Sequence, residues 1–124
     1  AMHAFSHITG GGVAANIARV LPADRIAELD RSTWAPPPIM TLIGELGNIG
    51  QADLERTFNM GIGMVAVVAA DAATTALALL AERGVDAWQV GAVRRRSQAE
   101  LGDAAAKGGQ GGATMLVSSY RSAG

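Results

Sequence analysis

Three consecutive glycines, Gly10–Gly12, stand between a short strand-like segment and a run of residues with helical spacing. In such a turn the backbone N–H groups point inward, and the positive end of the following helix lies behind them. Glycine also permits the positive φ angles and the close approach that an anion-binding turn needs. The stretch therefore predicts a phosphate site, although three glycines alone are explained equally well by a plain tight turn before a helix.

Polar side chains near this turn could complete such a site. Thr9 adds a hydroxyl group, and Asn16 and Arg19 are three residues apart on roughly one helical face, so both could reach the same anion. His7 precedes the turn and is the histidine that we expect to function. On a strand, His3 and His7 would be about 13 Å apart, too far to share one metal ion, so no metal site is predicted.

A second polar group precedes the most apolar part of the chain. The stretch "RTFNMGIGM" begins with Arg56 and contains Asn59. In the functional interpretation, Asn59 and the following glycines line the same cleft as the triple-glycine turn. In the simpler interpretation, a helix ends here and Asn59 adopts the left-handed conformation. The residues alone leave both interpretations open.

Two nucleotide-binding motifs compete with the phosphate interpretation. The spacing Gly10-x-Gly12-x-x-Ala15, with Asp30 ending the next strand, fits a dinucleotide fingerprint. The first strand, however, is rich in His, Ser and Ala, unlike a buried parallel strand, and the later elements do not alternate regularly. A Walker A loop is excluded because no G-K-[ST] follows the glycines.

The elements that must position these residues are a mixture of strands and helices. Hydrophobic spacing predicts strands at 2–8, 25–30, 60–70 and 86–93, and helices at 13–21, 39–46, 51–58 and 72–84. Segment 60–70 is apolar on both faces, so we expect it to be central in its sheet. The order predicts an α/β (α+β) sandwich with helices packed on a mixed sheet, formed by residues 1–93. Residues 94–124 are expected to add a glycine-rich loop or tail to the same domain, with a possible edge strand at 113–120.

Composition limits the function further. The 124 residues are 49% hydrophobic, enough for one domain with a real core. A net charge of −1 gives no electrostatic footprint for nucleic acid or an anionic membrane, so neither is an expected partner. The absence of cysteine excludes disulfides, thiolate metal sites and cysteine nucleophiles. No signal peptide is evident, and the expected location is the cytoplasm.

Three motifs together carry a family resemblance. With "HITGGG…NIARVLP", "DRSTWAPPPI" and "RTFNMGIGM" in this order, the chain resembles the C-terminal half of phosphoribosylformylglycinamidine cyclo-ligases, also called aminoimidazole ribonucleotide synthetases. The resemblance runs from Met2 to Val93. It departs from the family at Ala15, where a glutamate is common, so this chain lacks that carboxylate.

The resemblance implies an ATP-dependent ligase of purine biosynthesis, which closes the imidazole ring of formylglycinamidine ribonucleotide and releases aminoimidazole ribonucleotide, ADP and phosphate. It implies that ATP and Mg²⁺ are bound mainly by an N-terminal half, and that the full-length enzyme is a homodimer. We therefore expect the isolated chain to be inactive. His7 would orient the substrate or assist proton transfer. The expected substrate- or phosphate-binding residues are Thr9, Gly10, Gly11, Gly12, Asn16, Arg19, Arg56 and Asn59.

Other functions remain open at this point. Related ATP-dependent enzymes of the same superfamily include the amidotransferase synthetase, the thiamine monophosphate kinase and the selenophosphate synthetase. A non-catalytic module that binds a phosphorylated ligand is a further alternative, since fold does not imply function. The pairing of "HITGGG" with "RTFNMG" favours the cyclo-ligase. Whether the glycines hold the substrate's phosphate or the transferring one is undecided.

Overall fold

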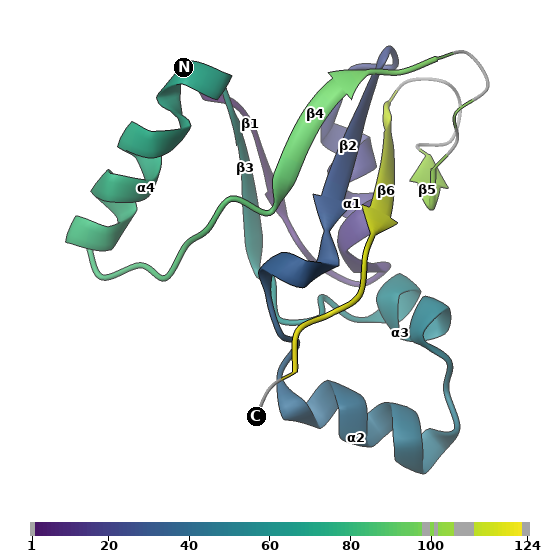
Figure 1. Cartoon of the computed structure of the whole chain (residues 1–124). Helices are drawn as coiled ribbons and strands as arrows, with labels where there is room; N and C mark the ends of the chain where they lie inside the picture. Colours follow the sequence, from purple (N-terminus) through teal and green to yellow (C-terminus); the bar gives the residue numbers. More distant parts are fainter. Residues whose placement is uncertain (1, 98–99, 101, 106–110, 123–124) are drawn as a thin grey trace.

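The computed structural model describes residues 2–97, 100, 102–105 and 111–122 (Figure 1). Its strands are β1 (Met2–His7), β2 (Arg25–Asp30), β3 (Met64–Val68), β4 (Gly91–Arg95), β5 (Ala104–Ala105) and β6 (Ala113–Val117). Its helices are α1 (Gly12–Val20), α2 (Pro38–Gly47), α3 (Gln51–Thr57) and α4 (Ala73–Glu82), with 3₁₀ turns η1 (Arg31–Thr33) and η2 (Ala70–Ala72). None of these helices is long and apolar enough to cross a membrane.

The strands form two sheets. Four of them follow the order β4-β2-β6-β5, in which β2 is antiparallel to β4 and parallel to β6. The other sheet is an antiparallel pair of β1 and β3. The larger sheet is mixed and helices accompany it, so the predicted α+β class is confirmed.

Helix α1 supplies much of the core. Val13, Ile17 and Leu21 are buried and belong to one cluster with Ala27 and Leu29 of β2. Burial of each large aliphatic side chain contributes about 1.5–3 kcal/mol, so this stripe fixes the helix on the sheet. The helix ends at Val20, one residue before its predicted end, because Leu21 precedes a proline and is extended. The packing of α1 on the sheet also positions its first residue, Gly12, which is the last of the three glycines.

The strand expected at the C-terminal edge is not at an edge. It is present as β6, but β6 lies between β2 and β5. Small residues allow this position: Ala113 and Thr114 are fully buried, and the Thr114 hydroxyl donates to the Ala14 carbonyl oxygen at 2.9 Å. A Cβ atom at Gly112 would stand 2.4 Å from the Arg25 carbonyl oxygen. Within the segment expected to be a loop or tail, Arg94 belongs to β4 and Ala104–Ala105 form β5, whereas residues 106–110 lie outside the described residues.

The expectation that segment 60–70 forms a central strand is also wrong. Met60 and Gly61 adopt positive φ angles of 53° and 96°, so the strand begins only at Met64. In the described part of the chain, β3 pairs with β1 alone. Met64 and the neighbouring Phe5 are more than half exposed. Apolarity on both faces therefore does not correspond here to burial on both faces.

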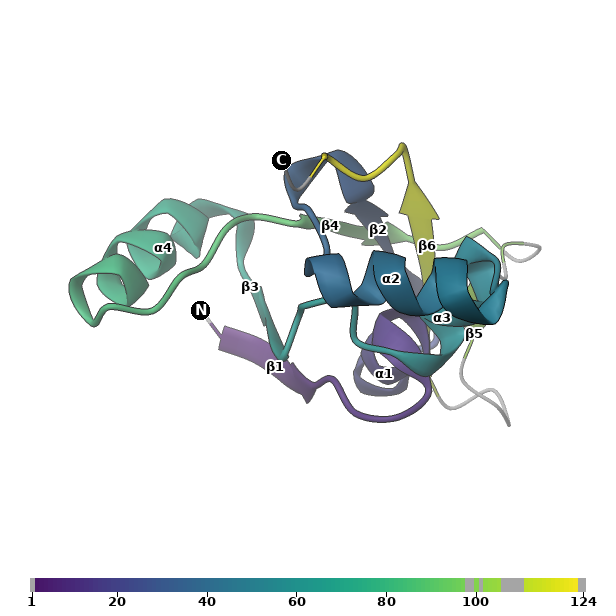
Figure 2. The ribbon, with the colours of Figure 1, turned by 90° about the horizontal axis from the view of Figure 1, so that it is seen from below.

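Two helices leave their apolar residues largely uncovered. In α2 only Gly44 is buried, whereas Leu46 of the predicted apolar stripe is 80% exposed. Helix α4 buries none of its residues, and Figure 2 shows it standing apart from α1–α3. The N-cap position of α4 is occupied by Ala72 without a side-chain hydrogen bond, and Asp71 lies within η2.

Candidate functional site

The triple-glycine turn has the backbone conformation that the sequence predicts. Gly11 and Gly12 have φ angles of 99° and 86°, and α1 begins at Gly12 without a side-chain cap. Side-chain-bearing residues in this left-handed region cost roughly 1–2 kcal/mol each, so glycine is required here. Within the described ranges, no hydrogen bond uses the N–H groups of Gly10 or Gly11. These donors, at the positive end of α1, are free to meet an anion.

The glycines differ in what surrounds them. A Cβ atom at Gly12 would stand 1.8 Å from the Glu55 carbonyl oxygen, so this position is needed for close packing of α1 against α3. A Cβ atom at Gly10 would meet nothing within 4 Å. Gly12 therefore serves the packing of the fold, whereas Gly10 faces open space.

Asn16 holds the turn from within. Its side chain is buried, and its Nδ2 donates to the carbonyl oxygens of Thr9 at 3.1 Å and Gly12 at 2.7 Å. Its Oδ1 accepts from the Thr9 hydroxyl at 3.1 Å and from Nη1 of Arg19 at 3.2 Å. The structure thus brings Thr9, Asn16 and Arg19 together, as predicted. In this arrangement the Asn16 amide and the Thr9 hydroxyl donate their hydrogen bonds within the turn itself.

Arg19 adds positive charge to the turn. Its Nη2 lies 3.7 Å from where a Cβ atom at Gly11 would stand, and its side chain is otherwise exposed. The guanidinium group therefore lies over the same glycine whose N–H group is free. This arrangement suits a phosphate, because charge-assisted hydrogen bonds to a guanidinium are stronger than neutral ones.

A pocket of about 310 Å³ opens beside the turn. It is lined by Ile8, Thr9, Gly10, Met40, Thr57, Phe58 and Asn59. The structure therefore places Asn59 and part of the glycine turn on one pocket, whereas Gly61 and Gly63, which the functional interpretation of "RTFNMGIGM" also assigned to it, do not line it. The Asn59 Oδ1 accepts from the Gly61 N–H at 2.8 Å. The left-handed residue that follows α3 is Met60, not Asn59 as expected.

His7 and Arg56 do not line this pocket. His7 is exposed at the end of β1, where it pairs in register with Met64 of β3. The Arg56 guanidinium forms an ion pair with Asp53 on the exposed side of α3. Their predicted roles in the site stay predictions.

Comparison with known proteins identifies the family. Residues 1–103 match the family described as AIR synthase related protein, C-terminal domain. The chain belongs to this family. The match confirms the resemblance predicted from the motifs and extends it past Val93 to Asp103.

Two relatives of this AIR synthase-related domain carry the cyclo-ligase name. A putative phosphoribosylformylglycinamidine cyclo-ligase of Streptomyces fradiae is 54% identical over 97 residues, which are 78% of this chain and 53% of that protein. A phosphoribosylformylglycinamidine cyclo-ligase of Methylobacillus flagellatus is 42% identical over 95 residues, 77% of this chain and 28% of that protein. The chain thus spans about half the length of the first relative and less of the second.

Sequence reasoning missed a buried charged cluster in this domain. Glu55 of α3 is 8% exposed, and its carboxylate accepts from Nε and Nη2 of Arg31 at 2.8 and 2.9 Å. The Tyr120 hydroxyl donates to the same carboxylate. Burial, together with the hydrogen bond to Glu55, raises the pKa of Tyr120, so its hydroxyl remains a donor at neutral pH. No local pattern could reveal this cluster, because its members come from distant parts of the chain.

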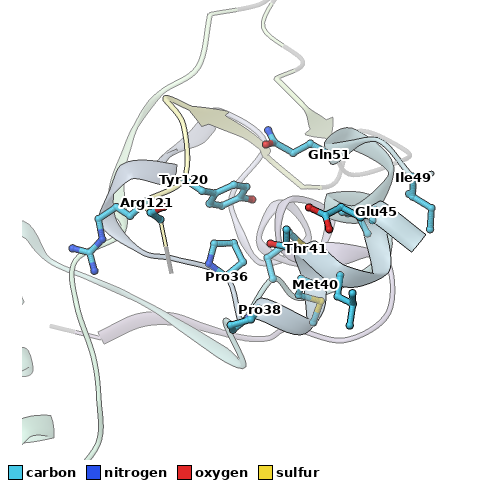
Figure 3. Close-up of a pocket in the computed structure, with 14 residues that line it drawn as sticks. Pro36, Pro38, Met40, Thr41, Glu45, Ile49, Gln51, Tyr120 and Arg121 are labelled. Carbon is cyan, nitrogen blue, oxygen red and sulfur yellow. The ribbon is translucent and has the colours of Figure 1, made fainter. Parts of the chain in front are cut away.

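A larger pocket of about 630 Å³ lies between α2 and the C-terminal residues. Figure 3 shows the Tyr120 ring directed into it, whereas the Arg121 side chain points away. The ring packs edge-on against Trp34, with centroids 5.2 Å apart. The triple-glycine turn is not among the residues that line this pocket.

Across the residues that the structure describes, no group of three or more His, Asp or Glu side chains could hold a metal ion. The described residues therefore provide no cluster that would hold a metal ion without oxygens from a substrate.

Proposed function

We propose that the chain is the C-terminal part of an ATP-dependent phosphoribosylformylglycinamidine cyclo-ligase, which converts formylglycinamidine ribonucleotide to aminoimidazole ribonucleotide in purine biosynthesis. The names of its relatives support this activity. The observation that carries the proposal is the glycine turn at the start of α1, with free N–H groups beside a pocket lined by Thr9, Gly10 and Asn59.

In this proposal the turn binds a phosphate group. The N–H groups of Gly10 and Gly11 donate to its oxygens, and the guanidinium of Arg19 and the positive end of α1 balance its charge. Asn16 holds the turn in this conformation before the ligand arrives. Such preorganised donors need no rearrangement when charge develops, which is the main source of electrostatic catalysis.

The reaction proceeds in two stages. ATP first phosphorylates the formyl-derived amide oxygen of the substrate, which converts a poor leaving group into phosphate. The amidine-side nitrogen then attacks that carbon, the C–O bond to phosphate breaks, and the imidazole ring closes. ATP and Mg²⁺ are bound mainly by the N-terminal domain of a cytoplasmic homodimer, so the isolated 124-residue chain has no activity of its own.

Gly10→Ala in the full-length enzyme tests the phosphate site. A Cβ atom there enters the open space of the pocket, so we expect the KM of one substrate to rise roughly tenfold, equivalent to about 1.4 kcal/mol of lost binding. A rise for formylglycinamidine ribonucleotide assigns the turn to the substrate's phosphate, and a rise for ATP to the transferring one. Gly63→Ala is the matched control, because a Cβ atom there also meets nothing within 4 Å but lies outside the pocket. Two unchanged KM values would contradict the proposal.

His7→Ala tests the proposed proton-transfer role. Since general acid–base groups typically contribute on the order of 10²–10⁴ in rate, we expect kcat to fall about a hundredfold. His3→Ala is the control, because His3 is an exposed histidine on the same strand. Steady-state kinetics of both variants give the comparison. Equal kcat values for the two variants would remove His7 from the mechanism.

A further inference from the structure

Glu55 lies at the meeting point of three parts of the chain. Its carboxylate takes two hydrogen bonds from Arg31 of η1 and one from Tyr120 near the C-terminus. Its backbone carbonyl oxygen packs against Gly12, where no side chain fits. The Glu55 backbone is thus fixed against the glycine turn, and its carboxylate is fixed by the buried ion pair.

The C-terminal residues also contact Arg31, the partner of Glu55. Nη1 of Arg31 donates to the carbonyl oxygens of Leu116 and Ser118, both at 3.2 Å, so the end of β6 is tied to the same guanidinium. That guanidinium also lies over the Tyr120 ring, with Cζ 5.8 Å from the centroid. These contacts join residues 116–120, here called the strap, to the ion pair between Arg31 and Glu55.

The pocket wall follows directly after Glu55. Helix α3 ends two residues later, at Thr57, and Thr57, Phe58 and Asn59 line the pocket together with Thr9 and Gly10. A second contact lies next to these residues in the chain: Trp34, which the Tyr120 ring contacts, donates from Nε1 to the carbonyl oxygen of Met60, the residue after Asn59, at 3.1 Å. Glu55 is thus connected to both groups of lining residues, since it contacts Gly12 of the glycine turn and precedes Thr57–Asn59 in the chain.

We propose that Glu55 is a positioning residue for the phosphate pocket and that the strap at 116–120, through Tyr120, sets the pocket's affinity. The strap lies beyond residues 1–103, the part of the chain that matches the family. A segment outside the family match therefore tunes a site within it. This inference rests on the proposed function, because it assumes that the glycine turn binds a phosphate of one substrate.

Tyr120→Phe in the full-length enzyme is the decisive variant, since it removes one hydroxyl and keeps the ring. We expect it to raise the same KM that Gly10→Ala raises, on the order of tenfold, because small displacements of a binding group are costly. The other KM and kcat should change less than about twofold. Glu55→Gln should raise the same KM, with a larger effect. A purely structural role would lower the melting temperature and the active fraction without changing either KM, and that outcome overturns the inference.

Arg94→Gln is the matched control. It breaks an exposed ion pair with Glu100 at 2.7 Å, away from the pocket, so it should leave both KM values unchanged. An equal effect of Arg94→Gln and Tyr120→Phe would also overturn the inference.

Titration with inorganic phosphate separates this inference from the proposed function. In the same full-length proteins, the amide signals of Gly10 and Gly11 should shift on addition of phosphate, with a dissociation constant several-fold weaker in Tyr120→Phe. If the parent lacks ring-closing activity, the proposed function fails, but a weaker phosphate affinity in Tyr120→Phe still supports the positioning role. Equal affinities, or no phosphate binding in the parent, overturn it.

Discussion

Gly12→Ala should lower the free energy of unfolding by about 2–5 kcal/mol, enough to unfold a marginal domain. The new Cβ atom would stand 1.8 Å from the Glu55 carbonyl oxygen, so α1 and α3 must separate. Overpacking of this kind costs about 1–3 kcal/mol. The φ angle of 86° adds roughly 1–2 kcal/mol for any residue with a side chain. Denaturant unfolding of the variant and its parent measures the difference.

The neighbouring glycines provide the controls. Gly11→Ala should cost only the conformational part, about 1–2 kcal/mol, because the nearest atom to the new Cβ is 3.7 Å away. Gly10→Ala should change stability by less than about 0.5 kcal/mol, since nothing surrounds it. Equal losses at Gly10 and Gly12 would show that the contact with Glu55 does not govern the turn.

Elements with local signals could be predicted from the sequence. Pro22 stops α1, and Gly47 with Asn48 ends α2, where Asn48 adopts the left-handed conformation. Strand β2 matches its predicted bounds, Arg25–Asp30. In each case the residues that determine the element lie within it or next to it.

Elements that depend on distant partners could not be predicted in the same way. Strand β6 is internal because Gly112 and Ala113 let it approach β2. In the sequence it follows a polar, glycine-rich stretch, which suggested an edge strand instead. Strand β3 is as apolar as a central strand, yet its exposure depends on which strands are available to pair with it. The spacing of apolar residues within a strand does not indicate which other strand pairs with it.

The candidate site shows the same division. The sequence indicated the glycine turn and its polar neighbours, because they lie within one turn and the helix that follows. It could not show that Gly12 packs against α3 while Gly10 faces the pocket, since Glu55 is 43 residues from Gly12 by numbering. The ion pair between Arg31 and Glu55 was missed for the same reason.

Arg31→Leu should be strongly destabilising. It leaves the Glu55 carboxylate buried with only the Tyr120 hydroxyl as partner. Removing one member of a buried ion pair typically costs about 3–5 kcal/mol, because the remaining charge is neither solvated nor paired. Denaturant unfolding again gives the free-energy difference.

The double variant Arg31→Leu, Glu55→Leu separates the charge from the packing. Replacing a whole buried pair with apolar residues is often neutral, so the double variant should recover most of the loss in unfolding free energy. Recovery will be incomplete to the extent that the Leu116 and Ser118 carbonyl oxygens need the Arg31 guanidinium. Arg25→Ala, which breaks an exposed pair with Asp24, should change stability by less than about 1 kcal/mol. A double variant as unstable as Arg31→Leu alone would mean that the strap carbonyls, rather than the buried carboxylate, need the arginine.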